Sequence, residues 1–302
     1  YESIQEAVEK AAPGDTITVT ADHELVWDGE TVIDDSLASM VVVAGKAVTI
    51  DLNGHALTVD ADKMTQDLYA VFAADAGGSL TLKDQVGTGS VKANGTAYTN
   101  SSTTAYCLMM AYEDGTKLTV NGGTYEMEAA HDSLIYSGGN EIVTVTGGNF
   151  TLGNVGTGEN GKPWIFNALG SNDRHVLVTG GTFNANVYDQ NWRHEVQCPA
   201  GIVKAIRDNG NGTWTVVDAE AYVIVDHAGY DYYVGYETGA EAFAAAKADE
   251  EVCIQKAGSY TVPTGKNLTI TGTVDGVVFD MGISKPNMGG AHVTFNNVTF
   301  NW

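Results

Sequence analysis

The chain has 302 residues, 43% of them hydrophobic, and its 38 acidic side chains against 15 basic ones give a formal net charge of -23 at pH 7. Proteins that bind nucleic acids need clustered Lys and Arg to displace counterions, so this charge excludes nucleic acid as a partner and argues against anionic membrane surfaces. With 36 glycines, only 5 prolines and short runs of Val, Thr, Ile, Tyr and Phe, the composition favours a turn-rich, all-β fold.

The first predicted element is a helix over residues 2–12, ESIQEAVEKAA, whose apolar residues recur at spacings of three and four. Pro13 and Gly14 end this helix, and TITVT at 16–20 begins a series of short strands. Between about residues 20 and 238 no long helical periodicity is present. The next predicted strands are MVVVAG at 40–45, AVTIDLNGHALTV at 47–59, LYAVFAA at 68–74, SLTLKD at 79–84, GSVKA at 89–93 and AYCLMMAY at 105–112.

One phrase then occurs three times: an apolar strand, a glycine pair, a polar residue, an aromatic residue and more strand. The three copies are KLTVNGGTYEM at 117–127, IVTVTGGNFTL at 142–152 and VLVTGGTFNAN at 176–186. We expect Tyr125, Phe150 and Phe183 to point inward and stack from copy to copy, with glycines at corners that a Cβ would obstruct. The spacing favours a parallel solenoid over a sandwich of hairpins, which would need two-residue turns at about 8–12 residue intervals.

The pattern of the N-terminus returns near the end of the chain as helix, acidic turn and strands. The residues that give its helical spacing are Ala240, Phe243, Ala244 and Lys247. We therefore expect a parallel β-helix unit over 1–218, connector strands over 219–239, and the start of a second, truncated unit over 240–302. The abrupt start at Tyr1 leads us to expect an excised piece of a longer chain.

SIQEAVEKAAPGDTITV at 3–19 resembles the entry of right-handed parallel β-helix proteins of the pectin-lyase-like superfamily, and AVTIDLNGHALTV at 47–59 resembles the coil that follows. Within 180–217, GGTFNANVYD followed by DNGNGTWTVV resembles the closing segment of β-helix modules in very large adhesin-like surface proteins of Gram-positive bacteria. Residues 188–206 depart from the short linker usual there. The resemblance covers about residues 1–217.

This resemblance implies a right-handed parallel β-helix with an N-terminal helical cap, followed by a connector and a second partial unit. It also implies an extracellular location, either secreted or anchored to a bacterial cell wall. The chain is expected to act as a monomer within a longer multi-module protein. No signal peptide and no membrane-spanning run is visible, so membrane insertion is not expected.

The resemblance also implies that enzymes use this fold, so the carboxylates and basic residues of the chain are candidate catalytic groups. Glycosidases need two carboxylates about 5–10 Å apart, yet the outward positions in the three phrases are Thr119, Thr144 and Leu177. The resemblance implies that a polysaccharide lyase would use a basic residue with Ca²⁺. The best catalytic candidates are Asp173, Arg174 and His175, although a solvated turn with a local salt bridge is the favoured explanation of these residues.

Metal ligands are not evident in the sequence. Cys107, Cys198 and Cys253 lack the close pairs of structural zinc sites, and Cys107 lies in an apolar run that we expect to be buried. We expect no disulfide framework, no metal site and no cofactor. Weak Ca²⁺ binding at turns rich in Asp and Asn stays open, although turn chemistry explains those residues.

Two long insertions, 153–175 and 188–198, are the candidate binding loops, because recognition usually lies on loops held by a rigid frame. Aromatic and Arg side chains anchor interfaces and stack on sugars. The candidate ligand-binding residues are Asn160, Lys162, Trp164, Tyr188, Trp192 and Arg193. An alternative for the first insertion is that Trp164 and Phe166 begin a buried strand.

The sequence thus favours a non-catalytic adhesion module that binds a host glycoprotein, such as mucin or immunoglobulin, or a glycan. A carbohydrate-active enzyme, either a polysaccharide lyase or a glycoside hydrolase, is the first alternative. A structural stalk without a specific ligand is the second.

Overall fold

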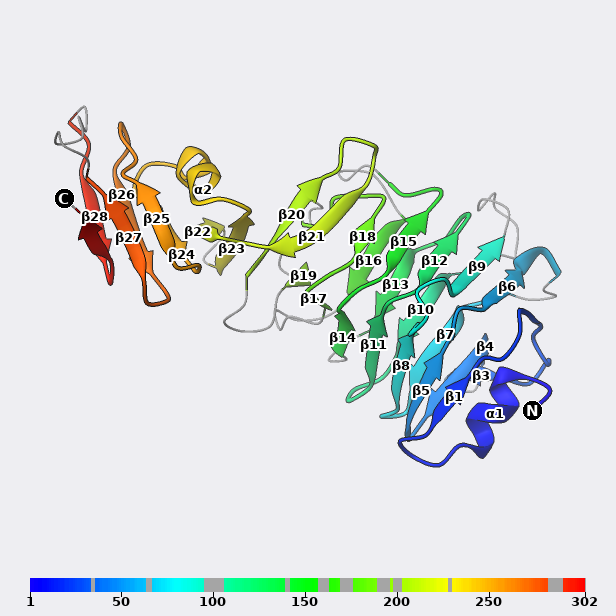
Figure 1. The fold of residues 1–302 in the computed structure, drawn as a ribbon. Helices are drawn as coiled ribbons and strands as arrows, with labels where there is room; N and C mark the ends of the chain where they lie inside the picture. Colours follow the sequence, from blue (N-terminus) through cyan, green and yellow to red (C-terminus); the bar gives the residue numbers. More distant parts are fainter. Residues whose placement is uncertain are drawn as a thin grey trace. The chain divides into compact units, whose positions relative to one another are not determined.

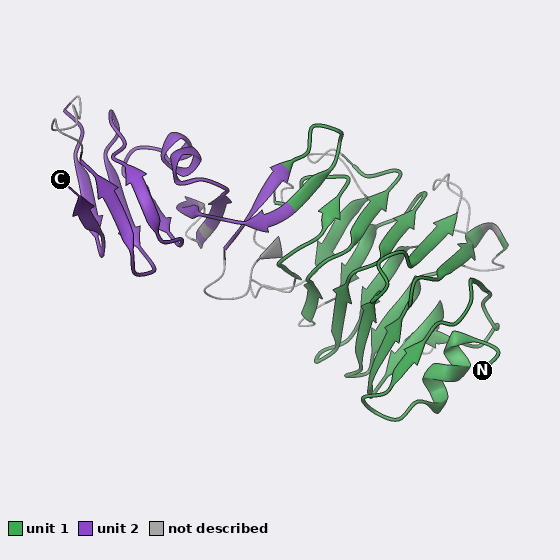
Figure 2. Cartoon of the chain, in the orientation of Figure 1, with its two compact units in different colours: residues 1–197, 208–215 green, residues 198–207, 216–302 purple. Residues whose placement is uncertain are grey.

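The computed structural model forms two compact units, unit 1 with residues 1–197 and 208–215, and unit 2 with residues 198–207 and 216–302 (Figure 2). The residues that the structure describes are 1–33, 36–63, 67–94, 106–138, 142–156, 163–168, 176–188, 196–197, 203–227, 230–281 and 290–301. Strands dominate both units, and the two α-helices in these ranges have seven residues each. No helix in these ranges has the length and apolar character needed to cross a membrane.

Helix α1 (Ile4–Lys10) forms within the predicted segment (Figure 1). Ser3 is its N-cap, and the Ser3 hydroxyl accepts a hydrogen bond from the Glu6 backbone N–H at 3.0 Å. Its buried face consists of Ile4, Ala7 and Val8. These are the N-terminal residues of the predicted apolar stripe.

Unit 1 contains three sheets, which the chain supplies in turn (Figure 1). The first sheet has the order β1 (Thr16–Thr18), β5 (Ala47–Asp51), β8 (Ser79–Lys83), β11 (Lys117–Asn121), β14 (Ile142–Val145), β17 (Val176–Val178) and β19 (Val196–Gln197). The second has β2 (His23–Leu25), β6 (Ala56–Asp60), β9 (Ser90–Asn94), β12 (Thr124–Met127), β15 (Asn149–Leu152) and β18 (Thr182–Phe183), which pairs with the start of β21 (Trp214–Asp218). The third has β3 (Val32–Ile33), β4 (Leu37–Ala44), β7 (Ala70–Asp75), β10 (Cys107–Ala111), β13 (Ser133–Ser137) and β16 (Trp164–Ala168). A 3-10 turn, η1, spans Ala61–Lys63.

Consecutive coils of the chain pair in parallel. The strands from β4 to β18 form five groups of three, and each group contributes one strand to each sheet. In the first sheet Thr49, Thr81, Thr119 and Thr144 are register partners in succession. This parallel pairing excludes the sandwich of hairpins and is compatible with the predicted all-β solenoid.

The predicted aromatic ladder is confirmed. The rings of Tyr125 and Phe150 are stacked with centroids 5.3 Å apart, and those of Phe150 and Phe183 lie 4.9 Å apart. Each of the three side chains is at most 1% exposed. Because a stacked aromatic pair contributes about 0.5–1.5 kcal/mol beyond its area burial, this column is a principal stabilising element of unit 1.

The glycine pairs adopt the predicted corners. Gly148 and Gly181 have φ values of 115° and 113°, in the region that disfavours side chains. A Cβ added to Gly180 would lie 2.3 Å from the Thr146 carbonyl oxygen, because the backbones of successive coils approach each other closely there.

The third sheet is buried on both faces. Every residue of β7, β10 and β16 is buried, and so are four of the five residues of β13. Val42, Ala73 and Met110 occupy one register column and belong to a separate hydrophobic cluster, against which Tyr112 and Tyr136 pack. Because both faces of these strands are buried, their sequences lack the alternation of polar and apolar residues that is seen in the other two sheets.

Unit 2 is built from hairpin and parallel strands around one helix. Its elements are β20 (Lys204–Asp208), β22 (Ala221–His227), β23 (Tyr230–Tyr236), α2 (Gly239–Ala245), β24 (Glu251–Ile254), β25 (Gly258–Thr261), β26 (Leu268–Gly272), β27 (Val277–Asp280), β28 (Val293–Asn296) and β29 (Thr299–Asn301). Strand β22 pairs antiparallel with β23 and β24, whereas β24, β26 and β28 are parallel, as are β25, β27 and β29.

Helix α2 forms where predicted. Thr238 and Glu241 make a capping box, and the buried side chains are Ala242, Phe243 and Ala246. Of the four residues that give the helical spacing in the sequence, only Phe243 is buried, and Ala240, Ala244 and Lys247 are exposed.

Both units contain the same local structure around their helix. In each, one lysine ammonium donates to three carbonyl groups at the end of the helix, where carbonyls lack partners within the helix. The acceptors are Val8, Glu9 and Ala11 for Lys46, and Phe243, Ala244 and Ala246 for Lys266. The strand after each helix then pairs in parallel with the strand after each lysine, β1 with β5 and β24 with β26. The predicted boundaries at residues 218 and 239 stay predictions.

Candidate functional site

Most of the residues predicted from the sequence to bind or react lie outside the described residues. These are Asp173, Arg174 and His175 of the catalytic set, and Asn160, Lys162, Trp192 and Arg193 of the ligand-binding set. Their roles stay predictions. Trp164 and Tyr188 are the two members of these sets whose surroundings the structure shows.

Trp164 is the first residue of β16 and is 8% exposed, and Phe166 on the same strand is 2% exposed. Its register partner in the preceding coil is Ser133. This placement agrees with the alternative in which Trp164 and Phe166 begin a buried strand. The indole ring therefore has little surface to offer a ligand.

Tyr188 is half-buried beyond the third glycine-pair phrase. Its phenol donates a hydrogen bond to the Val178 carbonyl at 3.1 Å, and its backbone N–H donates to Asn186 Oδ1 at 3.0 Å. The first bond ties the ring to the end of β17. Its binding role stays a prediction.

Several carboxylates on the outer faces of unit 1 form ion pairs with lysines. In the three sheets of its described part, no two carboxylates are register partners; Glu126 lies 3.3 Å from Lys92, and Asp51 lies 3.4 Å from Lys83. Glu24 on β2 and Asp60 on β6 lie on neighbouring coils, and both contact the Lys63 ammonium. In unit 2, Asp226 and Asp231 are partners across the β22–β23 hairpin, where both are exposed. An acid catalyst of a glycosidase instead needs surroundings that raise its pKa.

Three half-buried rings form a row at the entrances of the third-sheet strands. Tyr69 immediately precedes β7, Tyr106 immediately precedes β10, and His131 lies two residues before β13. The Tyr69 and Tyr106 rings stack with centroids 5.3 Å apart and planes at 17°, and the Tyr106 and His131 rings are 4.7 Å apart at 37°. We call these three residues the ring row.

A buried polar pair lies beside the ring row. Asp132 and Asn167 are 2% and 3% exposed, and Asn167 Nδ2 donates a hydrogen bond to Asp132 Oδ2 at 2.6 Å. Burial, followed by the negative charge of Asp132, raises the pKa of the Tyr136 phenol and of the Cys107 thiol. Both groups therefore stay protonated at neutral pH, which makes Cys107 a poor nucleophile.

The sequence carries only a weak signal for the ring row. Tyr69, Tyr106 and His131 each stand just before an apolar run, in LYAV, AYCL and AHDSL. Their spacing follows the variable length of the coils, so it shows no fixed period. The Asp132–Asn167 bond joins residues 35 apart and has no local pattern.

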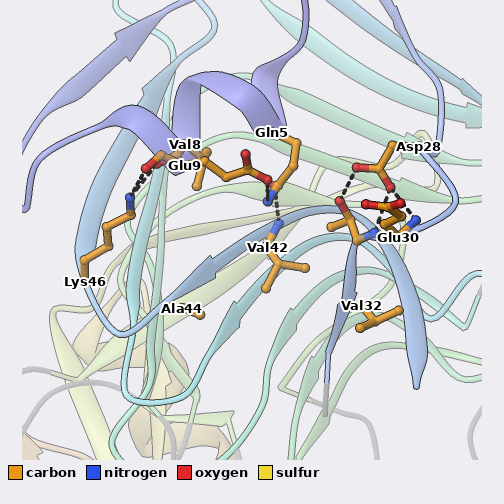
Figure 3. A pocket seen from close by; sticks show the side chains of 10 residues that line it. Gln5, Val8, Glu9, Asp28, Glu30, Val32, Val42, Ala44 and Lys46 are labelled. Carbon is orange, nitrogen blue, oxygen red and sulfur yellow. Dashed lines mark hydrogen bonds between the residues drawn. The ribbon is translucent and has the colours of Figure 1, made fainter. Parts of the chain in front are cut away.

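A separate pocket of about 410 Å³ lies between α1, the 28–32 segment and the end of β4 (Figure 3). Val8, Val32, Val42 and Ala44 form its apolar part. Its polar part consists of Gln5, Glu9, Asp28, Glu30, Thr31 and Lys46.

The polar groups of this pocket already bond within the protein. Gln5 Oε1 accepts from the Val42 N–H at 2.9 Å, and the Lys46 ammonium is engaged by the end of α1 (Figure 3). Burial acts to raise the pKa of Asp28, but hydrogen bonds from Thr31 and from the Glu30 N–H outweigh it and lower that pKa. These bonds fix the 28–31 turn, so we interpret the pocket as part of the structural contact between α1, this turn and the end of β4.

The described residues contain no group of three or more His, Cys, Asp or Glu side chains placed to hold a metal ion. Cys107 and Cys253 are buried free thiols, as expected for Cys107, and Cys198 lies outside the described residues.

Comparisons with protein-family models, with curated proteins and with solved structures found no match.

Proposed function

We propose that this chain is a non-catalytic, ligand-binding module of an extracellular bacterial surface protein, either secreted or anchored to the cell wall. Its ligand is a host glycoprotein, such as mucin or immunoglobulin, or a glycan, and it acts as a monomer within a longer chain. The extracellular assignment rests on the resemblance of residues 1–217 to adhesin-like modules.

The finer fold in this proposal is a right-handed parallel β-helix that α1 caps. Crossovers between parallel strands of one sheet are right-handed in about 98% of cases, which supports the handedness. The hydrogen bond from the Val42 N–H to Gln5 and the three bonds from Lys46 attach α1 to the first coil and support its role as a cap.

The observation that carries the non-catalytic assignment is the content of the outward columns. Threonines fill one column through Thr49, Thr81, Thr119 and Thr144, and ion pairs of opposite charge occur in others. A hydrolase on this frame would need two carboxylates on neighbouring coils, and the pair that the described part does place in this way, Glu24 and Asp60, is held by the Lys63 ammonium. A rigid frame with long loops is instead typical of recognition.

Binding and turnover assays test this proposal. The purified chain should bind immobilised mucin, immunoglobulin or a glycan on an array, and should release no product from polygalacturonate or mucin glycans. Trp192→Ala, in the second predicted loop, should weaken binding to the glycoprotein. Turnover of any of these substrates would overturn the non-catalytic assignment, and absence of all binding would favour the stalk.

A further inference from the structure

We propose that the ring row, Tyr69, Tyr106 and His131, is a binding site for a neutral glycan that lies across the entrances of the third-sheet strands. This inference rests on the proposed function and adds to the predicted loops a second site with a stated ligand class. The glycan contacts ring edges and phenol hydroxyls rather than ring faces.

The edge-on contact follows from the stacking. Because the Tyr69 and Tyr106 rings lie nearly parallel and 5.3 Å apart, the faces between them are occupied by each other. What a half-buried ring in such a row offers to a ligand is its edge. A phenol hydroxyl both donates and accepts hydrogen bonds, which suits the hydroxyl groups of a sugar.

The row is held rigidly by backbone hydrogen bonds between coils. The N–H of Tyr69 donates to the Ala38 carbonyl at 2.8 Å, and that of Tyr106 donates to the Leu68 carbonyl at 2.7 Å. The Asp132 N–H donates in turn to the Tyr106 carbonyl at 3.1 Å. A row fixed before the ligand arrives loses little conformational freedom on binding, which favours affinity.

The buried pair supports the third member of the row. Asp132 follows His131 directly, and its carboxylate is bonded to Asn167 on β16 of the next coil. This hydrogen bond therefore ties the turn that carries His131 to the next coil. Asp132 is a positioning residue here, because it is too buried to contact a ligand.

Local charge selects a neutral ligand. Asp132 is the charged group that acts on the neighbouring Tyr136 and Cys107, and the whole chain carries -23. A uronate or a sialic acid would bring a second negative charge to this region without a described lysine or arginine in the row to offset it. Neutral hexoses and N-acetylhexosamines carry no such penalty.

A glycan array containing neutral and acidic glycans tests the inference. A glycan that the wild-type chain binds on the array is then used in calorimetric titrations. Tyr106→Phe keeps the stacked ring and removes the hydroxyl, so it should fold normally and bind about threefold to tenfold more weakly. Tyr69→Phe should behave in the same way. Tyr233→Phe is the matched control, since Tyr233 is 44% exposed in unit 2 and should leave affinity unchanged.

The outcomes separate this inference from the proposed function. Equal affinity of wild type, Tyr106→Phe and Tyr69→Phe for a neutral glycan would overturn the site while leaving the function intact. Preference for acidic glycans would overturn the ligand class. If the chain binds deglycosylated mucin or immunoglobulin but no glycan on the array, only this inference is overturned. If it binds none of these ligands, this inference and the proposed function are both overturned.

Discussion

Replacing Phe150 with alanine should destabilise unit 1 strongly. Phe150 is 1% exposed and lies between Tyr125 and Phe183, at ring-centroid distances of 5.3 and 4.9 Å. Deleting a buried Phe side chain costs about 3–5 kcal/mol. Because this substitution also removes two stacked pairs, we expect the upper part of that range, about 4–5 kcal/mol in the free energy of unfolding of unit 1.

Urea unfolding followed by circular dichroism, together with a thermal melt, measures this loss. A unit of about 200 residues loses about 2–4 °C in melting temperature per kcal/mol, so the expected fall is about 8–20 °C. The slope of the urea transition should stay constant, because the surface exposed on unfolding hardly changes. The matched control is Phe300→Ala in unit 2, where the half-buried ring has less to lose.

Two results would refute the reasoning. One is a loss below about 2 kcal/mol at constant slope, which would show that the column relaxes around the gap. The other is an equal loss from Phe300→Ala, which would show that burial and stacking of Phe150 add nothing particular.

Three further predictions concern single groups. The Tyr125 hydroxyl is buried without a hydrogen-bond partner in the described part of the chain, so Tyr125→Phe should raise the free energy of unfolding by up to about 1 kcal/mol in urea titrations, and a loss would contradict this. Lys266→Met should cost unit 2 about 1–2 kcal/mol by removing three bonds at the end of α2, and Lys46→Met should do the same in unit 1 only. Burial raises the pKa of Cys253 from 9.0 to about 11. Since the folded thiol keeps its proton where the unfolded one loses it, stability should fall as the pH rises from about 9 to 11. Cys253→Ala should make that fall shallower, as urea midpoints at several pH values would show.

Periodicity in the sequence was sufficient for the first two sheets of unit 1. The alternation around the glycine pairs places Phe150 and Phe183 inward, and the glycines at 148 and 181 take the corners that only they tolerate easily. The orientation of a half-buried strand is visible in the sequence, because one face of the strand must be apolar and the other polar.

Apolar runs predict β4, β7 and β10 of the third sheet, but neither β13 nor the ring row could be found from periodicity. Strand β13 (Ser133–Ser137) is buried on both faces and carries serines at its ends, so it shows neither alternation nor a long apolar run. The helical spacing of α2 likewise does not identify its buried face. Alanine occupies so many positions in AEAFAAAKA that only packing decides which of them, such as Ala242 or Ala244, is buried.

The constancy of the register has a consequence for how such a protein can change. Gly122 and Gly147 are 25 residues apart, and Gly147 and Gly180 are 33 apart, yet both intervals deliver their strands to matching partners. Surplus residues are therefore accommodated outside the strands. Insertions and deletions between strands can accumulate over evolutionary time without disturbing the interior, so the surface is free to diversify while the architecture is inherited.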